Sequence, residues 1–163
     1  MRNVRDATME DIIRVCGRLR PEDRAEQFAR LPHSSGAALA DLLLQLTPLV
    51  IGRFAICTPD GEAQTILAAY RGGDGLAQLH RISTDRWDDV SRTVFVFGVR
   101  HFVPEVLRPN ARRAECSVMT RHTAAGDMLR RLGFRASGIE AQCGRGGEEF
   151  TRFVWTSNGG RDV

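Results

Sequence analysis

The chain of 163 residues is 42% hydrophobic, which is enough to bury a core as a single domain without disulfides or a bound metal. Its net charge of +3, from 23 basic and 20 acidic residues, is too balanced to indicate a nucleic-acid partner. No apolar run approaches the ~20 residues that span a membrane, and the polar start has no signal-peptide core. The sequence therefore predicts a cytoplasmic protein with no membrane partner.

The cysteines form neither a C-x-x-C pair nor a cysteine–histidine cluster, because all of them are far apart in the sequence. This spacing argues against a metal site and favours small hydrophobic residues buried in a reducing compartment. We expect this of Cys16, Cys57, Cys116 and Cys143.

The first third of the chain predicts a short strand followed by helices. Residues 3–7 read as the strand, and Thr8 followed by Asp11 has the spacing of a capping box, which predicts a helix directly afterwards. Pro21 is favoured in a first helical turn and predicts a second helix. The Ala/Leu-rich run 37–46 predicts a third.

The middle of the chain changes to β-rich runs. Residues 49–57, 63–70 and 76–83 are separated by turn residues, which predicts three adjacent antiparallel strands. From Trp87 the apolar period becomes helical, and a long helix is expected to about Leu107. Pro104 should bend or shorten its last turn, and residues 108–110 should lead into the next strand.

The last third alternates apolar and polar residues around Ala114, Cys116 and Val118, which is typical of a strand with one buried face. A helical period follows from His122, with Thr123 able to cap the helix and Gly133 to end it. A glycine-rich hairpin turn at 144–147 then precedes an aromatic strand. We therefore expect one domain over residues 1–156, an α/β (α+β) fold with a mixed, mostly antiparallel sheet flanked by helices, and a flexible tail at 157–163.

This order, with its strand, helix and Leu132-Gly133-Phe134 ending, resembles the GCN5-related N-acetyltransferase (GNAT) fold over nearly the whole chain. The stretch 19–26, with its Leu-Arg and Asp-Arg-x-Glu, resembles small GNAT-like proteins of tailed phages. An ordinary charged helix face is the other interpretation, and in either case Arg20, Asp23, Arg24 and Glu26 should be exposed. The phage resemblance implies phage structural or assembly proteins as partners, in the host cytoplasm or in the phage particle.

The GNAT resemblance implies an acetyl-coenzyme A site at the fourth strand and the loop after it. The family's Gln/Arg-x-x-Gly-x-Gly/Ala loop offers amides at a helix start to the diphosphate. Here the loop is the run 86–91, in which only Arg86 matches, and Asp89 and Ser91 replace the small residues. Asp88 and Asp89 would repel an anion, whereas Arg81, Arg86 and Arg92 would attract one from the flanks. If the cofactor binds, the resemblance implies contacts from Ile82, Ser83, Thr84, Arg86, Asp89, Val90, Ser91 and His122.

The catalytic groups are equally incomplete. Many GNAT enzymes have a tyrosine acid four residues before the glycine of Gly-Phe, where this chain has Leu129, and the only tyrosine, Tyr70, lies on an earlier strand. His80 and Glu115 are the candidates for a general base, although a half-buried structural histidine and a surface ion pair are equally good interpretations. Two hypotheses remain: a virion or assembly component with a degenerate acetyl-CoA site, which the sequence slightly favours, and an active N-acetyltransferase that acetylates an amine.

Overall fold

The computed structural model describes residues 1–32 and 34–157 and is built on one seven-stranded sheet in the order β1-β2-β3-β4-β5-β7-β6. All neighbouring strands are antiparallel except β4 and β5, which run parallel. The strands are β1 (Val4–Asp6), β2 (Val50–Cys57), β3 (Ala63–Gly73), β4 (Leu76–Ser83), β5 (Arg113–Met119), β6 (Arg135–Glu140) and β7 (Phe150–Thr156). This is the mixed, mostly antiparallel α+β fold that the sequence predicted. The expected tail lies, beyond Ser157, outside the described residues.

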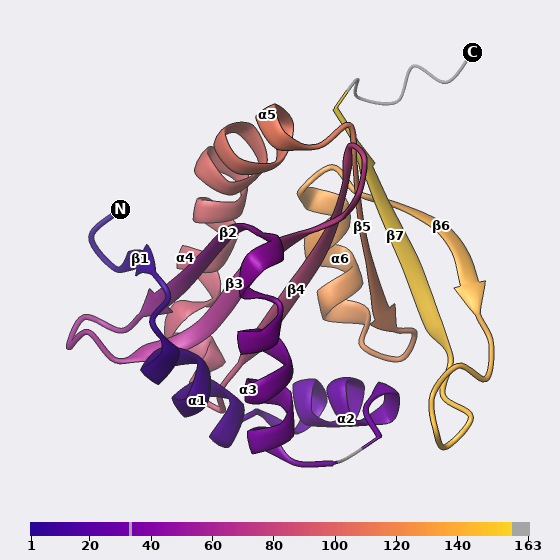
Figure 1. Ribbon diagram of the computed structural model, residues 1–163, viewed down its shortest axis with the longest axis horizontal. Helices are drawn as coiled ribbons and strands as arrows, with labels where there is room; N and C mark the ends of the chain where they lie inside the picture. Colours follow the sequence, from indigo (N-terminus) through magenta and orange to yellow (C-terminus); the bar gives the residue numbers. More distant parts are fainter. Residues whose placement is uncertain (33, 158–163) are drawn as a thin grey trace.

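Helices cover both faces of the sheet, with α1 and α3 on one face and α4 and α6 on the other (Figure 1). The helical segments are α1 (Met9–Gly17), α2 (Pro21–Arg30), α3 (Gly36–Gln45), the 3-10 turn η1 (Thr47–Leu49), α4 (Trp87–Phe97), the π-helix η2 (Gly98–Leu107), α5 (Arg108–Asn110) and α6 (Thr123–Arg131). Within the described residues, no helix is both long enough and apolar enough to cross a membrane.

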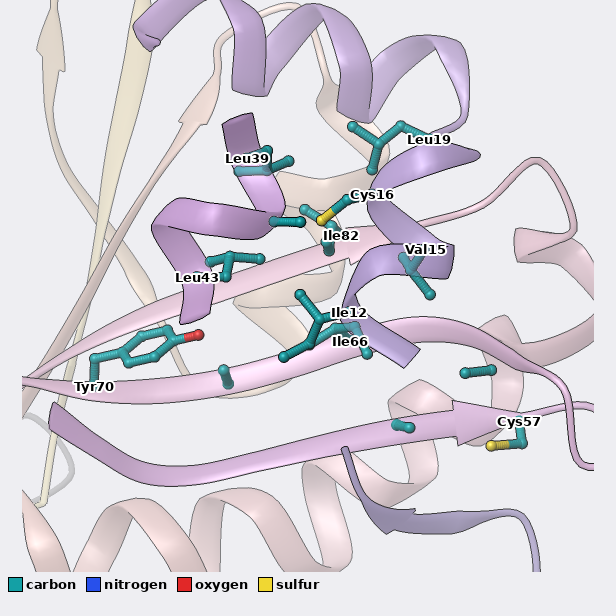
Figure 2. Packing of buried hydrophobic residues seen from close by; sticks show 14 residues of the cluster. Ile12, Val15, Cys16, Leu19, Leu39, Leu43, Cys57, Ile66, Tyr70 and Ile82 are labelled. Atoms are coloured by element: carbon teal, nitrogen blue, oxygen red, sulfur yellow. The ribbon is translucent and has the colours of Figure 1, made fainter. Parts of the chain in front are cut away.

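The capping box predicted for α1 is present. Thr8 Oγ1 accepts a hydrogen bond from the Asp11 amide at 3.2 Å, and the Asp11 carboxylate accepts one from the Thr8 amide at 2.8 Å. Burial alone would raise the pKa of Asp11, but hydrogen bonds from Arg5 and Thr8 lower it below its ordinary value. With its start fixed, α1 packs Ile12 and Val15 against α3 and the sheet in the larger of the two main core clusters (Figure 2).

The second main core cluster lies on the opposite face, where η2 and α6 pack on β3, β4, β5 and β7. The long helix runs to Leu107 as expected, and α5 adds one further turn at Arg108–Asn110. Pro104 lies inside η2. A proline cannot donate a backbone hydrogen bond and crowds the carbonyl four residues before it, and here the helix widens to π geometry instead of stopping.

Three smaller sequence predictions can also be compared with the structure. His122, not Thr123, is the N-cap of α6, and it makes no side-chain capping hydrogen bond, so the predicted cap is wrong. Gly133 does end this helix, with φ of +90°. Cys16 and Cys57 are buried as predicted, but Cys116 on β5 is only half-buried, and Cys143, in the loop after the largely exposed strand β6, is exposed.

The glycine-rich segment 144–147 forms the predicted turn between β6 and β7. Its Arg145 has a structural role that the sequence did not indicate. The Arg145 guanidinium donates to the carbonyl oxygen of Leu31 at 2.9 Å, and its amide donates to that of Ala29 at 2.8 Å. The turn therefore satisfies carbonyl groups at the C-terminal end of α2 and fixes this helix beside the sheet.

Candidate functional site between the diverging strands β4 and β5

The site forms where the two parallel strands separate. β4 and β5 pair only over Leu76–Gln78 and Arg113–Glu115, and each strand continues unpaired with the other for several residues. Two cavities open along this divergence, one toward each face of the sheet. They share six lining residues, namely Glu26, Gln27, Leu79, His80, Cys116 and Ser117. These six residues therefore form a wall that the two cavities have in common.

The first cavity, here called the apolar chamber, lies on the face covered by α4, η2 and α6. It has a volume of about 90 Å³ and is lined mainly by hydrophobic side chains. Leu129 of α6 is among them. The position at which a GNAT tyrosine was expected therefore does face the divergence, but it carries no ionisable group. The other apolar residues include Leu67, Val94, Phe102, Val103, Val118, Met128, Leu132 and Phe134.

The second cavity, here called the polar chamber, lies on the α2 side. Its volume is about 340 Å³, and its walls come from α2, the end of α3, η1 and four strands. Hydrogen-bonding side chains are concentrated in it, including Glu26, Gln27, Arg30, Gln78 and Ser117. Because a cavity with such walls can hold polar groups, the two chambers suit different parts of a ligand, or two ligands.

His80 lies at the junction of the chambers and is held by α2. Its Nε2 is 2.8 Å from the Gln27 Oε1 atom, whereas its Nδ1 is buried without a hydrogen-bond partner among the described residues. Burial lowers the pKa of His80 to about 4, and Arg81 adds to this effect, although Glu26 and Asp23 oppose it. The imidazole is therefore neutral at pH 7 and presents one uncommitted nitrogen.

Cys116 also lies at the junction. Burial raises the pKa of its thiol to about 12, and the carboxylate of Glu26 contributes in the same direction. A thiol with so high a pKa stays protonated at neutral pH and is a poor nucleophile. Cys116 therefore provides a weak hydrogen-bond donor in this site rather than an attacking group.

Helix α2 lies across the wide end of the divergence (Figure 1). Asp23 Oδ2 accepts a hydrogen bond from the amide of Ser83, the last residue of β4, at 2.7 Å. Glu26 Oε2 accepts one from the amide of Met119, the last residue of β5, at 3.0 Å. Two buried carboxylates one helical turn apart thus connect the separated strand ends. We call this pair of contacts the α2 clamp.

Basic side chains neutralise the α2 clamp. Arg20 donates to Asp23 Oδ1 at 3.0 Å and lies 3.1 Å from His122 Nε2, and His122 Nδ1 is 3.3 Å from Glu26 Oε2. Arg20 and Arg81 also both lie over the ring of Trp87, at 4.7 and 4.5 Å from its centroid. Asp23 is therefore paired with arginines, as a buried charge must be, and Glu26 has the Met119 amide and the His122 ring as its hydrogen-bonding partners.

No protein-family model matches the chain, and a search of curated proteins found no match. Solved structures do match it. A protein named as a phosphinothricin N-acetyltransferase aligns with a TM-score of 0.71 at 10% identity, over 94% of this chain and 97% of that one. A GNAT-family acetyltransferase from Streptococcus pneumoniae gives 0.68 at 14% identity, over 94% and 97%. A ribosomal-protein-alanine N-acetyltransferase from Brucella melitensis gives 0.68 at 13% identity, over 94% and 98%.

The chain has a GNAT-like fold. At these identities the likeness concerns the arrangement of the backbone, and the residues of the site have to be judged one by one. The diverging parallel strands lie where the GNAT resemblance placed the acetyl-CoA cleft.

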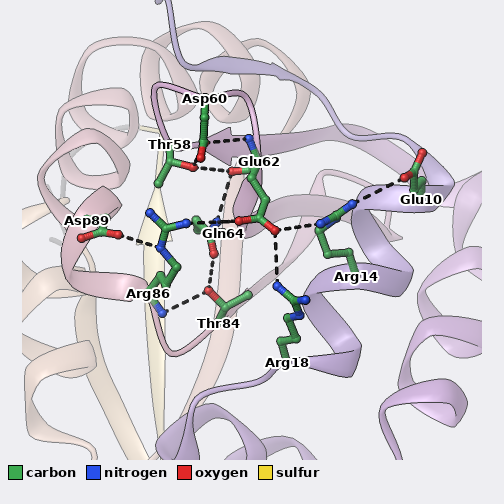
Figure 3. A network of polar contacts seen from close by, with 10 residues as sticks. All are labelled: Glu10, Arg14, Arg18, Thr58, Asp60, Glu62, Gln64, Thr84, Arg86 and Asp89. Carbon is green, nitrogen blue, oxygen red and sulfur yellow. Dashed lines mark hydrogen bonds and ion pairs between the residues drawn. The ribbon is translucent and has the colours of Figure 1, made fainter.

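The loop that should hold the diphosphate in a GNAT fold does not fit that group. Arg86, its one matching residue, donates to Glu62 Oε2 at 3.1 Å and to Asp89 Oδ2 at 2.9 Å (Figure 3). The amides of Trp87 and Asp89 donate to the carbonyl oxygens of Thr84 and Arg86, both at 3.1 Å. Arg86 and these two amides are therefore already hydrogen-bonded within the protein, and the carboxylates of Glu62 and Asp89 beside Arg86 would repel an anion.

Glu62 gathers further arginines around the same point. Its Oε1 atom accepts from Arg14 at 2.7 Å and from Arg18 at 3.3 Å, so that one carboxylate joins the β2–β3 hairpin to α1 and to the start of α4 (Figure 3). A hydrogen bond from Gln64 is the largest contribution that lowers the pKa of Glu62, and Arg14 and Arg18 add to it. Glu62 therefore occupies this arginine cluster as a carboxylate.

The other predicted cofactor contacts are also occupied in the structure. Ile82 and Val90 are buried in core clusters. The hydroxyl of Thr84 donates to Gln64 Oε1 at 2.6 Å, and that of Ser91 to the Asp88 carbonyl oxygen at 3.4 Å. Ser83, Arg81 and His122 belong to the α2 clamp and its neutralising contacts.

The two candidate bases are separated by the structure. His80 lies at the junction, whereas Glu115 pairs with Arg113 and lines neither chamber. The expectation that Arg20, Asp23 and Glu26 would be exposed is wrong: Asp23 is 1% and Glu26 8% exposed, and Arg20 is partly buried. Only Arg24 is exposed. The helical spacing of the polar residues 23, 26, 27 and 30 was the available signal, because it places them on one face.

Proposed function

We propose that this protein is a GNAT-type N-acyltransferase that acylates an amine at the junction of the two chambers. The observation that carries the proposal is the pair of cavities on the two sides of the β4–β5 divergence, which share His80 in their lining and of which the second has more hydrogen-bonding side chains. Such a geometry brings two reactants together from opposite faces of the sheet. The acetyltransferase names of structurally similar proteins support the same class of reaction.

The lining of each chamber suggests which reactant binds in it. The uncharged end of an acyl thioester suits the apolar chamber, and an amine suits the polar chamber. The amine nitrogen attacks the acyl carbonyl carbon, so that a C–N bond forms, the C–S bond breaks and the thiolate leaves. The amine gives up one proton, and the thiolate takes one to become a thiol. His80 is too weak a base to remove a proton from an ammonium ion, so its part is to orient a neutral amine by a hydrogen bond.

We further propose that the acyl donor is not held by a diphosphate contact. Arg86 and the amides at the start of α4 are committed to Glu62, Asp89 and nearby carbonyl groups. This is the sense in which the acetyl-CoA site is degenerate: the loop has lost its anion contacts, while the cleft remains. Acetyl-CoA should then bind weakly.

Comparing two donors tests both parts. Acetyl-CoA and S-acetylpantetheine, which lacks the diphosphate, are offered with a panel of amines, and acylated product is measured by mass spectrometry. We expect transfer with the two kcat/KM values within about tenfold of each other, because binding energy that is not used by the enzyme cannot be lost on truncation. A preference for acetyl-CoA of about a thousandfold would contradict the loop assignment. Absence of product from every amine with both donors would contradict the acyltransferase itself.

We keep as a second candidate function the one that the sequence resemblance of residues 19–26 implies. In this alternative the chain has kept the fold without the chemistry and serves as a virion or assembly component of a tailed phage, which binds phage structural proteins. Arg24, on the exposed side of α2, is a suitable probe of such a surface. Co-purification with phage structural proteins that is lost in Arg24→Glu, in a protein that shows no acyl transfer, would support this alternative. Acyl transfer without any such partner would reject it.

A further inference from the structure

Three buried side-chain atoms of the described residues have no hydrogen-bond partner, namely Arg20 Nε, Tyr70 Oη and His80 Nδ1. Among them, only His80 belongs to a residue that lines both chambers, and the other nitrogen of its ring lies 2.8 Å from Gln27 Oε1. Leaving a buried polar atom without a partner is unfavourable. An atom of this kind in a cleft is therefore a candidate contact for a ligand.

The contact with Gln27 determines what His80 can offer. A carbonyl oxygen only accepts, so the ring nitrogen facing Gln27 Oε1 has to carry the proton. A neutral imidazole has one N–H, and the unpaired Nδ1 must then carry a lone pair. The site thus presents an acceptor at the junction of the two chambers.

Burial keeps the ring neutral, although charged groups lie around it. Glu26 and Asp23 approach from α2 and favour a protonated ring, and Arg81 on β4 opposes them. Both carboxylates already accept hydrogen bonds from strand amides. Among these groups, Gln27 is the one that contacts a ring nitrogen of His80 directly.

We propose that Gln27 is a positioning residue that holds His80 as the Nε2–H tautomer, so that Nδ1 accepts a hydrogen bond from the N–H of the ligand amine. The ligand class is a neutral primary or secondary amine that enters from the polar chamber. The part concerning the amine rests on the proposed function. The tautomer assignment does not, because it concerns the free protein.

Nitrogen-15 NMR of the full-length chain tests the tautomer. Correlations from the ring carbon-bound protons to the two ring nitrogens distinguish a protonated from an unprotonated Nδ1, and the variant His80→Asn identifies the signal. We expect unprotonated Nδ1 in the wild type and, at a pH high enough that the new carboxylate does not add a second ring proton, in Gln27→Glu, which keeps an acceptor oxygen. In Gln27→Met, of similar size but without the acceptor, we expect a mixture of tautomers. Arg24→Ala, on the exposed side of the same helix, should match the wild type.

A wild-type spectrum with the proton on Nδ1, or a Gln27→Met spectrum identical to that of the wild type, would overturn the assignment. Both readouts are independent of catalysis. They therefore remain decisive even if the protein transfers no acyl group.

The proposed contact between the amine and His80 Nδ1 is tested by a separate measurement. Titration with n-propylamine at high pH, where much of it is neutral, should move the Nδ1 resonance of the wild type, whereas n-butane should leave it in place. If acyl transfer is observed, Gln27→Met should raise KM for the amine about tenfold, corresponding to the loss of one hydrogen bond, with Gln27→Glu nearer to the wild type and KM for the donor unchanged. An unmoved Nδ1 resonance, or equal loss in both KM values, would contradict an amine contact at His80.

Discussion

His80 shows how one residue can make stability depend on pH. Its pKa is about 4 in the folded protein, below the ordinary value of 6.5, chiefly because of burial. Between these values the unfolded chain binds a proton that the folded chain does not. The unfolded state therefore becomes more stable relative to the folded state as the pH falls. The contribution of His80 to stability is therefore complete above about pH 6.5 and lost toward pH 4.

We accordingly expect the free energy of unfolding to fall by up to about 1.4 kcal/mol per pH unit in this window because of His80. Urea denaturation at pH 7, 6, 5 and 4 measures the slope, and His80→Asn should flatten it. Carboxylates titrate at the lower end of the same window, so the difference between the two proteins is the relevant quantity. Identical slopes would mean that His80 is not held neutral by burial.

Leu129 is the second residue with a specific prediction. It packs against the second main core cluster and lines the apolar chamber, and it is half-buried. Because its environment already contains a cavity, Leu129→Ala should destabilise the protein by about 1–3 kcal/mol, below the 2–5 kcal/mol typical of fully buried leucines. Leu39→Ala is the matched control, since Leu39 is 1% exposed. An unchanged melting temperature for Leu129→Ala would show that its side chain makes no core contact.

At the scale of elements, the α2 clamp is the unusual feature of the fold. Parallel strands that separate leave unpaired backbone amides at their edges, and such edges need a partner. Asp23 and Glu26 provide it from one helix, and the turn around Arg145 holds the other end of that helix. The helix is thus fixed at both ends across the divergence.

We expect Asp23→Ala to destabilise the protein by about 3–5 kcal/mol, because it leaves two buried arginines and the Ser83 amide without their carboxylate. Glu22→Ala, at the exposed neighbouring position, should change stability by less than about 0.5 kcal/mol. Denaturation gives the energies, and hydrogen exchange at Ser83 should accelerate in Asp23→Ala alone. If Asp23→Ala were as stable as Glu22→Ala, the clamp would not contribute to the fold.

Substitutions at the start of α4 can test whether freeing Arg86 restores binding of acetyl-CoA. Replacing Asp89 and Ser91 with glycine removes a carboxylate and a side chain from the loop, but Glu62 still holds Arg86. We expect the double variant to gain little affinity for acetyl-CoA, and the triple variant that adds Glu62→Gln to gain at least about tenfold, because Arg86 is then free to pair with phosphate. Calorimetry measures this, and adding Arg86→Ala should remove the gain. Micromolar binding by the unaltered protein would contradict the degenerate loop.

At the scale of the whole molecule, the sheet order places β4 and β5, the one parallel pair among the described strands, between two antiparallel groups of strands. Each group carries its own helices, and the two main core clusters lie on opposite faces. The cleft is the boundary between the groups. Its lining therefore comes from segments as distant in sequence as α2 and β7.

The sequence by itself determined the elements and their order. The capping box at Thr8, the glycine stop at Gly133 and the three strands from Val50 to Ser83 are local signals, because period and turn chemistry act within a few residues. These signals sufficed for the fold class. The cleft and the incomplete loop at Arg86 were instead implied by the resemblance to the GNAT fold, and His80 was one of two candidate bases.

Only the tertiary structure decided which polar groups in that cleft are free. The local sequence around Asp23 and Glu26 does not distinguish them from the exposed acids of any charged helix. They are buried because α2 packs against strand ends that lie 60 and 93 residues away in the sequence. Arg86 is occupied because Glu62, on another hairpin, lies within reach. Hydrogen bonds and ion pairs act over a few ångströms, so their partners are set by how distant segments pack, and no local pattern contains that information.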